Sequence, residues 1–195
     1  HSAGNVGRGL AEADLVVEGH FETPFIEHAY LEPEAGVAYW EGDVLTLRVP
    51  AQSPFELRTQ MAMAMALPEE KVRIIISPIG GAFGGKLDGT VEPLLALAAY
   101  CTGRAVKMTL TREESLKRST KRHAYAMDYR VGLSKEGRIL AVDAKLFSDA
   151  GAYTDLSPRT IDQACIFACG PYEVPHLRVE GWAVYTNNVK GGAFR

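Results

Sequence analysis

One stretch decides the fold of this chain, Lys71-Val-Arg-Ile-Ile-Ile-Ser-Pro-Ile-Gly-Gly-Ala-Phe-Gly-Gly-Lys86. Its β-branched run is typical of a strand, and the run leads into four glycines within six residues. Glycine tolerates positive φ and leaves room for close approach, so successive amides of such a loop can form a nest for an anion such as phosphate. A tight strand-to-helix crossover without any ligand explains the same residues and stays open.

A phosphate loop of the nucleotide hydrolases is a second interpretation of this stretch. Gly80, Gly85 and Lys86 satisfy the first part of that pattern, but Leu87 stands where such a loop needs a Ser or Thr for magnesium. The apolar run that ends at Asp143 could supply the acid of such a site, but an ordinary strand just after the hairpin-like Ser134-Lys-Glu-Gly137 is the simpler explanation. The nucleotide hydrolase therefore remains an alternative at this point.

Composition indicates a globular chain without a nucleic-acid or membrane partner. The 195 residues are 47% hydrophobic and 23% charged, which predicts one domain or two closely packed halves. Lys and Arg number 21 against 24 Asp and Glu, so the net charge of -3 gives no electrostatic basis for binding nucleic acid or an anionic membrane. We expect the basic run from Lys117 to His123 to be a solvated surface.

Targeting signals and metal-binding patterns are not seen in the sequence. No apolar stretch approaches the roughly 20 residues that span a bilayer, and no signal-peptide pattern opens the chain, so we expect a cytoplasmic protein. The odd count of three cysteines and the missing Cys-x-x-Cys pair disfavour a disulfide framework and a zinc or iron–sulfur site. We expect these thiols to be buried.

Strand and helix patterns alternate along the chain. A helix-capping signature precedes residues 54–67, Thr111-Arg-Glu-Glu114 repeats it before a short helix, and an apolar helix over 91–101 should end at Gly103. Two hairpins are predicted among the helices, which favours an α+β fold with layered sheets and helices and a strand, glycine loop and helix crossover. The strands are predicted at 15–21, 36–40, 44–49, 71–76, 104–110, 124–131, 138–147 and 177–186.

Six segments of the sequence, in this order, resemble the molybdenum-binding subunit of the molybdenum hydroxylases, the xanthine dehydrogenase and aldehyde oxidoreductase family. The resemblance covers nearly the whole chain, and so many ordered segments are much more specific than a single glycine loop. It implies that residues 1–195 are a partial molybdopterin-binding domain, the N-terminal half of the molybdenum-binding region. The segments are Ala51-Gln-Ser53, Gly80-Gly-Ala-Phe-Gly-Gly-Lys86, Thr111-Arg-Glu-Glu-Ser115, Ser148-Asp-Ala-Gly-Ala-Tyr153, Gly170-Pro-Tyr-Glu-Val-Pro175, and Thr186-Asn187 leading to Gly192-Ala-Phe-Arg195.

The resemblance implies a cofactor and assigns residues to it. In that family, molybdenum held by a pterin dithiolene oxidatively hydroxylates an aldehyde or N-heterocycle with water, and the metal has no direct protein ligand. Gln52 should donate its amide to an oxo ligand of the metal. Two segments should contact the molybdopterin, whose dinucleotide form stays open; they are Gly81, Ala82, Phe83, Gly84 and Gly85, and Ala193, Phe194 and Arg195.

Two departures from the family pattern concern the substrate. Purine-oxidising members carry a glutamate where this chain has Leu87, and a substrate-binding arginine where ungapped alignment gives Gln163. The resemblance therefore implies an apolar or uncharged substrate pocket, although a purine held differently stays open. Glu27, His28 and Glu32 could form a local base or metal site, but we interpret them as structural hydrogen-bonding groups.

The resemblance also implies partners. The family's base glutamate lies in the other half of the molybdenum-binding region, and iron–sulfur and FAD centres lie in other domains or subunits. We therefore expect the isolated chain to be inactive and to lack molybdenum. An excised half would expose apolar area, so we also expect self-association. The remaining alternative is a non-catalytic packing module.

Overall fold

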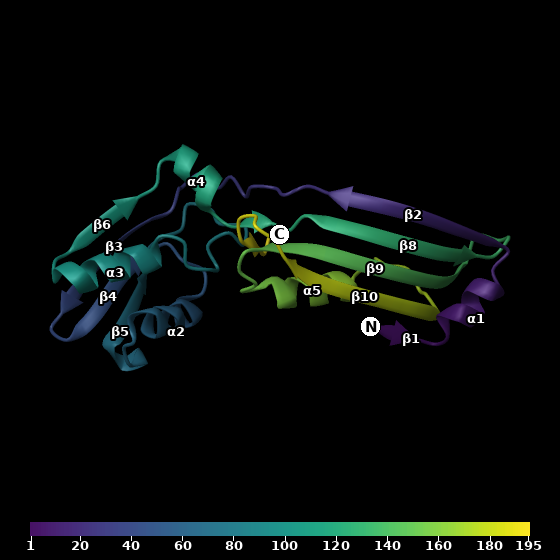
Figure 1. The fold of residues 1–195 in the computed structure, drawn as a ribbon, viewed down its shortest axis with the longest axis horizontal. Coiled ribbons are helices and arrows are strands. Elements are labelled where there is room, and N and C mark those ends of the chain that lie inside the picture. The colour runs from purple at the N-terminus through teal and green to yellow at the C-terminus, as the bar shows by residue number, and fades with distance from the viewer. The chain divides into compact units, whose positions relative to one another are not determined.

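The computed structural model describes residues 1–195 and divides the chain into two compact units. The first unit comprises His1–Ile26 and His123–Gly191, and the second comprises Glu27–Arg122 and Gly192–Arg195. Both are built from sheets and helices, so the predicted α+β class is confirmed (Figure 1). No helix has both the length and the apolar character that a membrane crossing requires.

The first unit is a five-stranded sheet in the order β1-β10-β9-β8-β2. β9 and β10 run parallel because α5 connects them, and the other neighbours are antiparallel. The unit's core packs α5 against β9 and β10, with Val142, Ala144, Leu146, Ile161, Cys165 and Val179 buried. Its elements are β1 (Ser2–Ala3), α1 (Val6–Ala11), β2 (Leu15–Thr23), β8 (Tyr125–Leu133), β9 (Ile139–Gly151), α5 (Ser157–Ile166) and β10 (His176–Tyr185).

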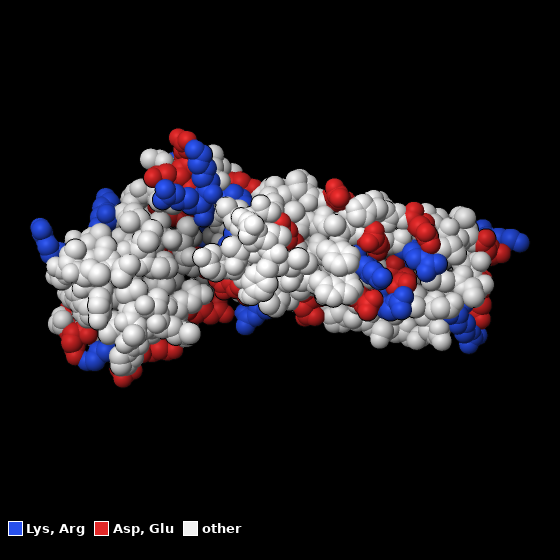
Figure 2. Space-filling model, in the orientation of Figure 1, with Lys and Arg blue, Asp and Glu red and all other residues white.

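Charged residues of alternating sign cross this sheet from strand to strand. One row pairs Glu18 with Arg130, Arg130 with Asp143, and Asp143 with Arg178. Arg178 binds Asp143 through two hydrogen bonds of 2.8 and 2.6 Å, and Arg130 binds Glu18 at 2.7 Å. Figure 2 shows acidic and basic side chains side by side over these strands. Cross-strand opposite charges stabilise a sheet, so this row helps to fix the register. Asp143 is thus the partner of an arginine in an ordinary strand.

The second unit is a four-stranded sheet in the order β5-β4-β3-β6, covered by helices α2 and α3. The β3–β4 hairpin turns at Gly42, whose φ of +63° suits glycine. Leu45, Leu47, Leu57, Met61 and Leu95 are buried between sheet and helices. The elements are β3 (Ala35–Glu41), β4 (Val44–Val49), α2 (Pro54–Met65), the 3₁₀ turn η1 (Glu69–Lys71), β5 (Val72–Ile76), α3 (Glu92–Thr102), β6 (Val106–Thr109), α4 (Arg112–Arg118) and β7 (Lys121–Arg122). The last strand, β11 (Gly191–Gly192), has one residue in each unit.

Local capping patterns predicted the helices of the second unit well. Thr111 and Glu114 form the predicted capping box reciprocally, and Gly103 ends α3 in the left-handed conformation. One capping prediction was wrong, because the Ser53 side chain makes no hydrogen bond at the start of α2. That helix ends at Met65, followed by Ala66 in the left-handed region.

Two expectations about exposure were wrong. Lys121 and His123, at the end of the basic run, are buried, because Lys121 pairs with Glu27 and His123 bonds Ser157. A paired charge can be buried where an isolated one cannot. Among the thiols, Cys165 is buried as expected, whereas Cys101 is exposed.

Candidate functional site

The glycine loop after β5 folds back through successive tight turns. Gly85 donates its N–H to the Ala82 carbonyl at 2.8 Å, and Leu87 donates to Gly84 at 3.4 Å. Gly81 and Gly84 have φ of +96° and +101°, and Phe83 has φ of +52° although it is not glycine. The amides of residues 81–84 donate to no protein acceptor. The loop therefore offers a run of backbone donors held in a strained conformation.

Most of the loop glycines are required by the protein's own packing. A Cβ on Gly80 would lie 2.6 Å from the Glu32 Cβ, and one on Gly85 would lie 2.7 Å from Tyr30 Cε1. A Cβ on Gly84 would lie 2.5 Å from the Ala193 carbonyl oxygen. The close approach that the glycines permit is thus to neighbouring protein segments, which is what a tight crossover alone would also require.

The segment Glu27–Glu34, hereafter the strap, holds this loop in place. The Glu32 carboxylate accepts a hydrogen bond from the Gly80 amide at 2.9 Å and from the Lys86 ammonium at 2.7 Å. Burial acts to raise the pKa of Glu32, but the hydrogen bonds from Lys86 and Gly80 outweigh it and lower the pKa. The buried Lys86 ammonium also lies 4.7 Å from the Tyr30 ring centre. Since Lys86 is committed to Glu32, it is not a phosphate-binding lysine, which disfavours the nucleotide hydrolase.

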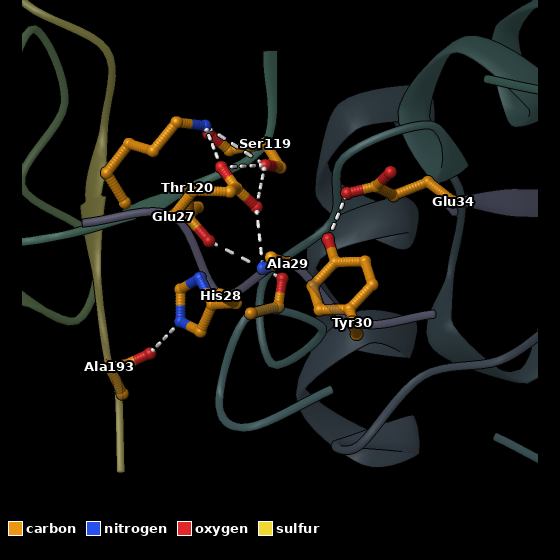
Figure 3. A network of polar contacts seen from close by, with 10 residues as sticks. Glu27, His28, Ala29, Tyr30, Glu34, Ser119, Thr120 and Ala193 are labelled. Atoms are coloured by element: carbon orange, nitrogen blue, oxygen red, sulfur yellow. Dashed lines mark hydrogen bonds and ion pairs between the residues drawn. The ribbon is translucent and has the colours of Figure 1, made fainter. Parts of the chain in front are cut away.

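The remaining polar groups of the strap are anchored inside the second unit (Figure 3). Glu27 accepts hydrogen bonds from the Ser119 hydroxyl at 3.0 and 3.1 Å and pairs with Lys121 at 2.6 Å. Tyr30 donates its hydroxyl to Glu34, and burial raises the pKa of Tyr30. These bonds support the interpretation of Glu27 and Glu32 as structural groups. No group of three or more His, Cys, Asp and Glu side chains is placed to hold a metal ion.

Gln52 is fixed against the end of the glycine loop by two hydrogen bonds. The backbone N–H of Gln52 donates to the Lys86 carbonyl at 2.9 Å, and the side-chain Oε1 of Gln52 accepts from the backbone N–H of Lys86 at 3.2 Å. Because the Lys86 N–H can only donate, the side-chain atom of Gln52 that faces it must be the oxygen and not the nitrogen of the amide. The side-chain nitrogen, which has no protein acceptor, is therefore presented as a neutral donor in a defined orientation.

The segment Ala193–Arg195, hereafter the terminal turn, lies against the same loop. The Arg195 N–H donates to the Phe83 carbonyl at 3.2 Å. The Ala193 carbonyl oxygen lies 2.6 Å from His28 Nε2, as Figure 3 shows. The Phe194 ring stacks on His28 with centroids 4.5 Å apart, and the Arg122 guanidinium lies 5.2 Å from the centre of the Phe194 ring. Loop, terminal turn and Gln52 thus form one connected group of hydrogen-bond donors, suited to anionic or oxo groups.

Comparisons with known proteins place the chain in a family. The family described as "Molybdopterin cofactor-binding domain" matches residues 1–195. The chain belongs to this family.

Individual relatives agree with that assignment. The "Nicotinate dehydrogenase large molybdopterin subunit" of Eubacterium barkeri is 44% identical over 193 residues, which are 98% of this chain and 45% of that protein. A "Probable xanthine dehydrogenase" subunit of Bacillus subtilis is 41% identical over 100% of this chain and 26% of that protein. The solved aldehyde oxidoreductase of Desulfovibrio gigas superposes with a TM-score of 0.95 at 28% identity, over 100% of this chain and 22% of that one. The chain therefore spans less than half the length of these relatives.

This molybdopterin-binding domain brings most of the predicted site residues together. Gln52, the loop residues 81–85 and the terminal turn all lie in the second unit and are joined by the bonds above. Leu87 follows the loop in the same unit and is half-buried, whereas Gln163 is an exposed residue of α5 in the first unit. Their sharing of one substrate pocket stays a prediction.

Sequence reasoning missed the part that the strap plays in the site. His28, Tyr30 and Glu32 contact Gly85, Gly81 and Gly80, respectively, and these three strap residues are two apart in sequence. Ala29, between His28 and Tyr30, has φ of +50°, so the strap is not a regular extended strand and a period of two does not explain these contacts. The sequence indicated Glu27, His28 and Glu32 as structural groups, but it did not indicate that the strap would face the glycine loop.

Proposed function

We propose that the glycine loop, Gln52 and the terminal turn hold part of a molybdopterin cofactor, and that the intact protein is a molybdenum hydroxylase. The reaction would be the hydroxylation of an aldehyde or N-heterocycle with oxygen from water. The observation that carries the proposal is the run of free amides over residues 81–84 beside the side-chain nitrogen of Gln52. Neutral donors of this kind bind phosphate and oxo groups without competing as metal ligands.

The chain's own residues supply position and hydrogen bonds. When bound, the molybdenum centre would supply the two-electron oxidation that no side chain can perform. The amides of Phe83 and Gly84 would hold the cofactor, and the side-chain nitrogen of Gln52 would donate to it from a fixed orientation. Arg195, whose guanidinium suits a phosphate or the edge of a pterin, would help from the terminal turn.

The class of substrate follows from the named relatives and from two residues of this chain. The relatives are named for nicotinate and xanthine, which are N-heterocycles, and for aldehydes. With Leu87 and Gln163 at the two positions considered above, recognition would not depend on charged side chains there. We propose a small aldehyde or N-heterocycle, bound mainly by apolar contacts and neutral hydrogen bonds.

The proposed reaction needs partners beyond these residues. The relatives above are named as a large molybdopterin subunit and as one subunit of a dehydrogenase. We propose that the remaining half of the molybdenum-binding region completes the site and supplies the base. Iron–sulfur domains or subunits, and in some arrangements an FAD subunit, would then carry electrons away.

Metal and pterin analysis of the intact protein that carries this chain tests the proposal. The protein should be purified from a host that makes molybdopterin, and both molybdenum and the fluorescent oxidised pterin should be measured. We expect one molybdenum and one pterin per chain, and turnover in a screen of aldehydes and N-heterocycles. A folded protein without either component would contradict the proposed function.

A further inference from the structure

His28 fills the space between two segments of the proposed cofactor site. Its side chain is buried, and the whole residue is only 5% exposed. On one side, a Cβ at Gly85 would lie 3.0 Å from the His28 Cγ and Nδ1 atoms. On the other side, the imidazole stacks on Phe194 with an interplanar angle of 25°. The ring therefore contacts the glycine loop at Gly85 and the terminal turn at Phe194.

The hydrogen bond of His28 shows which nitrogen of its ring is the donor. Nε2 lies 2.6 Å from the Ala193 carbonyl oxygen, and a carbonyl only accepts. The hydrogen is therefore on Nε2. Nδ1 is buried and has no protein partner, so the bond to Ala193 is the one hydrogen bond of the ring.

This bond fixes the point where the two segments meet. The Ala193 carbonyl oxygen that accepts from His28 is also the atom that a Cβ on Gly84 would meet first, at 2.5 Å. The direct loop-to-turn bond, from the Arg195 amide to the Phe83 carbonyl, is long at 3.2 Å. The shorter bond from His28 is therefore the stronger constraint on the turn.

We propose that His28 is a positioning residue of the cofactor site. It clamps the terminal turn onto the glycine loop and so sets the spacing between the backbone groups of the two segments. This inference rests on the proposed function, because the segments matter to catalysis only if they hold the cofactor. His28 itself acts through Ala193 and Phe194.

Three substitutions separate the donor of His28 from its ring. His28→Gln keeps an N–H donor, His28→Phe keeps the stacking ring without the donor, and His28→Ala removes both. His20→Gln is the matched control, because His20 is an exposed histidine of β2 in the first unit. Each variant is made in the intact protein.

Two quantities are measured, the amide hydrogen exchange of residues 192–195 and the content of molybdenum and pterin. We expect His28→Ala to speed exchange by about tenfold, the effect of losing one buried hydrogen bond, and to lower cofactor content. His28→Gln should change both least, and the control should change neither. Exchange in peptides of β3, β4 and α3 reports whether the second unit, which contains His28, is folded in each variant.

Several results would overturn the inference. Unchanged exchange at residues 192–195 in both His28→Ala and His28→Phe would show that no clamp exists. Faster exchange with cofactor content at the wild-type level would show that the clamp does not position the cofactor. If His28→Ala fails to fold, the other two variants decide. Equal exchange at residues 192–195 in His28→Gln and His28→Phe would show that the N–H donor of His28 does not hold the terminal turn. Failure of the proposed function is distinguishable, since it would appear as wild-type protein without molybdenum and pterin.

Discussion

The two units of this chain use their backbones differently. In the first unit, the long strands β8, β9 and β10 pair along almost their whole length, so their amides are taken up by the sheet. In the second unit, the glycine loop leaves the amides of residues 81–84 without protein acceptors. The half-buried carboxylate of Glu32, in the strap, holds that irregular backbone in place. The comparison shows that binding capacity lies where the backbone leaves regular structure and is anchored by side chains.

The largest expected effect comes from filling the contact between loop and terminal turn. Gly84→Ala places a Cβ 2.5 Å from the Ala193 carbonyl oxygen, and two backbones must separate to accept it. We expect the intact protein to lose most of its molybdenum and pterin, measured by metal analysis and pterin fluorescence.

Gly42→Ala is the matched control for that variant. Gly42 also has positive φ, at +63°, but a Cβ there meets nothing within 4 Å. Both variants put an alanine at positive φ, and only Gly84→Ala adds a contact with another backbone segment. Equal cofactor content in the two variants would contradict the assignment of the loop-to-turn contact.

The next effect concerns catalysis rather than binding. Gln52→Ala removes a neutral donor aimed at the cofactor, and such a loss commonly lowers turnover by about 10²-fold. Folding should survive, because the backbone bond from Gln52 to Lys86 remains. Gln60→Ala, on helix α2, is the control. Full turnover of Gln52→Ala in the intact protein would mean that Gln52 does not contact the reacting centre.

In the first unit, the strongest charge pair predicts loss of stability in acid. Hydrogen bonds from Arg178 lower the pKa of Asp143. A lowered pKa gives stability that is present above the unfolded pKa and is lost as pH falls. Asp143→Asn should therefore cost up to about 1 kcal/mol at neutral pH, since Arg178 is half-exposed and screened, and the cost should vanish in acid.

The measurement is the pH dependence of exchange in β9 and β10 peptides. Asp14→Asn serves as the control, because the pair of Asp14 with Lys135 is longer, at 3.7 Å, and more exposed. If exchange in the β9 and β10 peptides has the same pH dependence in acid for Asp143→Asn and the wild type, the pair of Asp143 with Arg178 does not contribute this stability.

In the second unit, a buried carboxyl predicts the opposite pH dependence, and the smallest effect. Burial raises the pKa of Glu92, and the charge of Glu34 adds to the rise. A raised pKa gives stability that is present below the unfolded pKa and is lost as pH rises through the folded pKa. Glu92→Gln should remove that loss while it still accepts the 2.7 Å hydrogen bond from Thr90.

Denaturation at several pH values tests this, followed by exchange in the α3 peptides. As pH rises above the ordinary range of a glutamate carboxyl, the second unit of Glu92→Gln should lose less stability than the wild type. The exposed Glu70→Gln should behave as the wild type does. A steeper loss in Glu92→Gln would reverse the sign that we assign.

Local patterns accounted for much of the fold, whereas long-range contacts accounted for what was missed. The hairpins and the capping box of Thr111 depend on neighbours in sequence, and they were predicted correctly. Helix α5 was not predicted, because no capping side chain marks its start and its buried residues are few. Lys121 was predicted to be solvated, since its partner Glu27 is far away in the sequence.

In the candidate site, too, local patterns were visible in the sequence, whereas long-range contacts were not. Glycines 80–85 were visible in the sequence as a loop, but the reason for their presence was not, because the strap and the terminal turn reach them only in the folded unit. His28 was noted with Glu27 and Glu32 as a structural group, but nothing in the sequence indicated that it would contact the loop and the terminal turn. The roles of Gln52 and the terminal turn came from the family resemblance.

An experimental structure of the intact protein with its cofactor bound tests the central claim most directly. We predict pterin or phosphate density against the amides of residues 81–84 and the terminal turn, with the side-chain nitrogen of Gln52 within hydrogen-bond distance of the cofactor. A cofactor bound without contact to either the glycine loop or Gln52 would contradict the account.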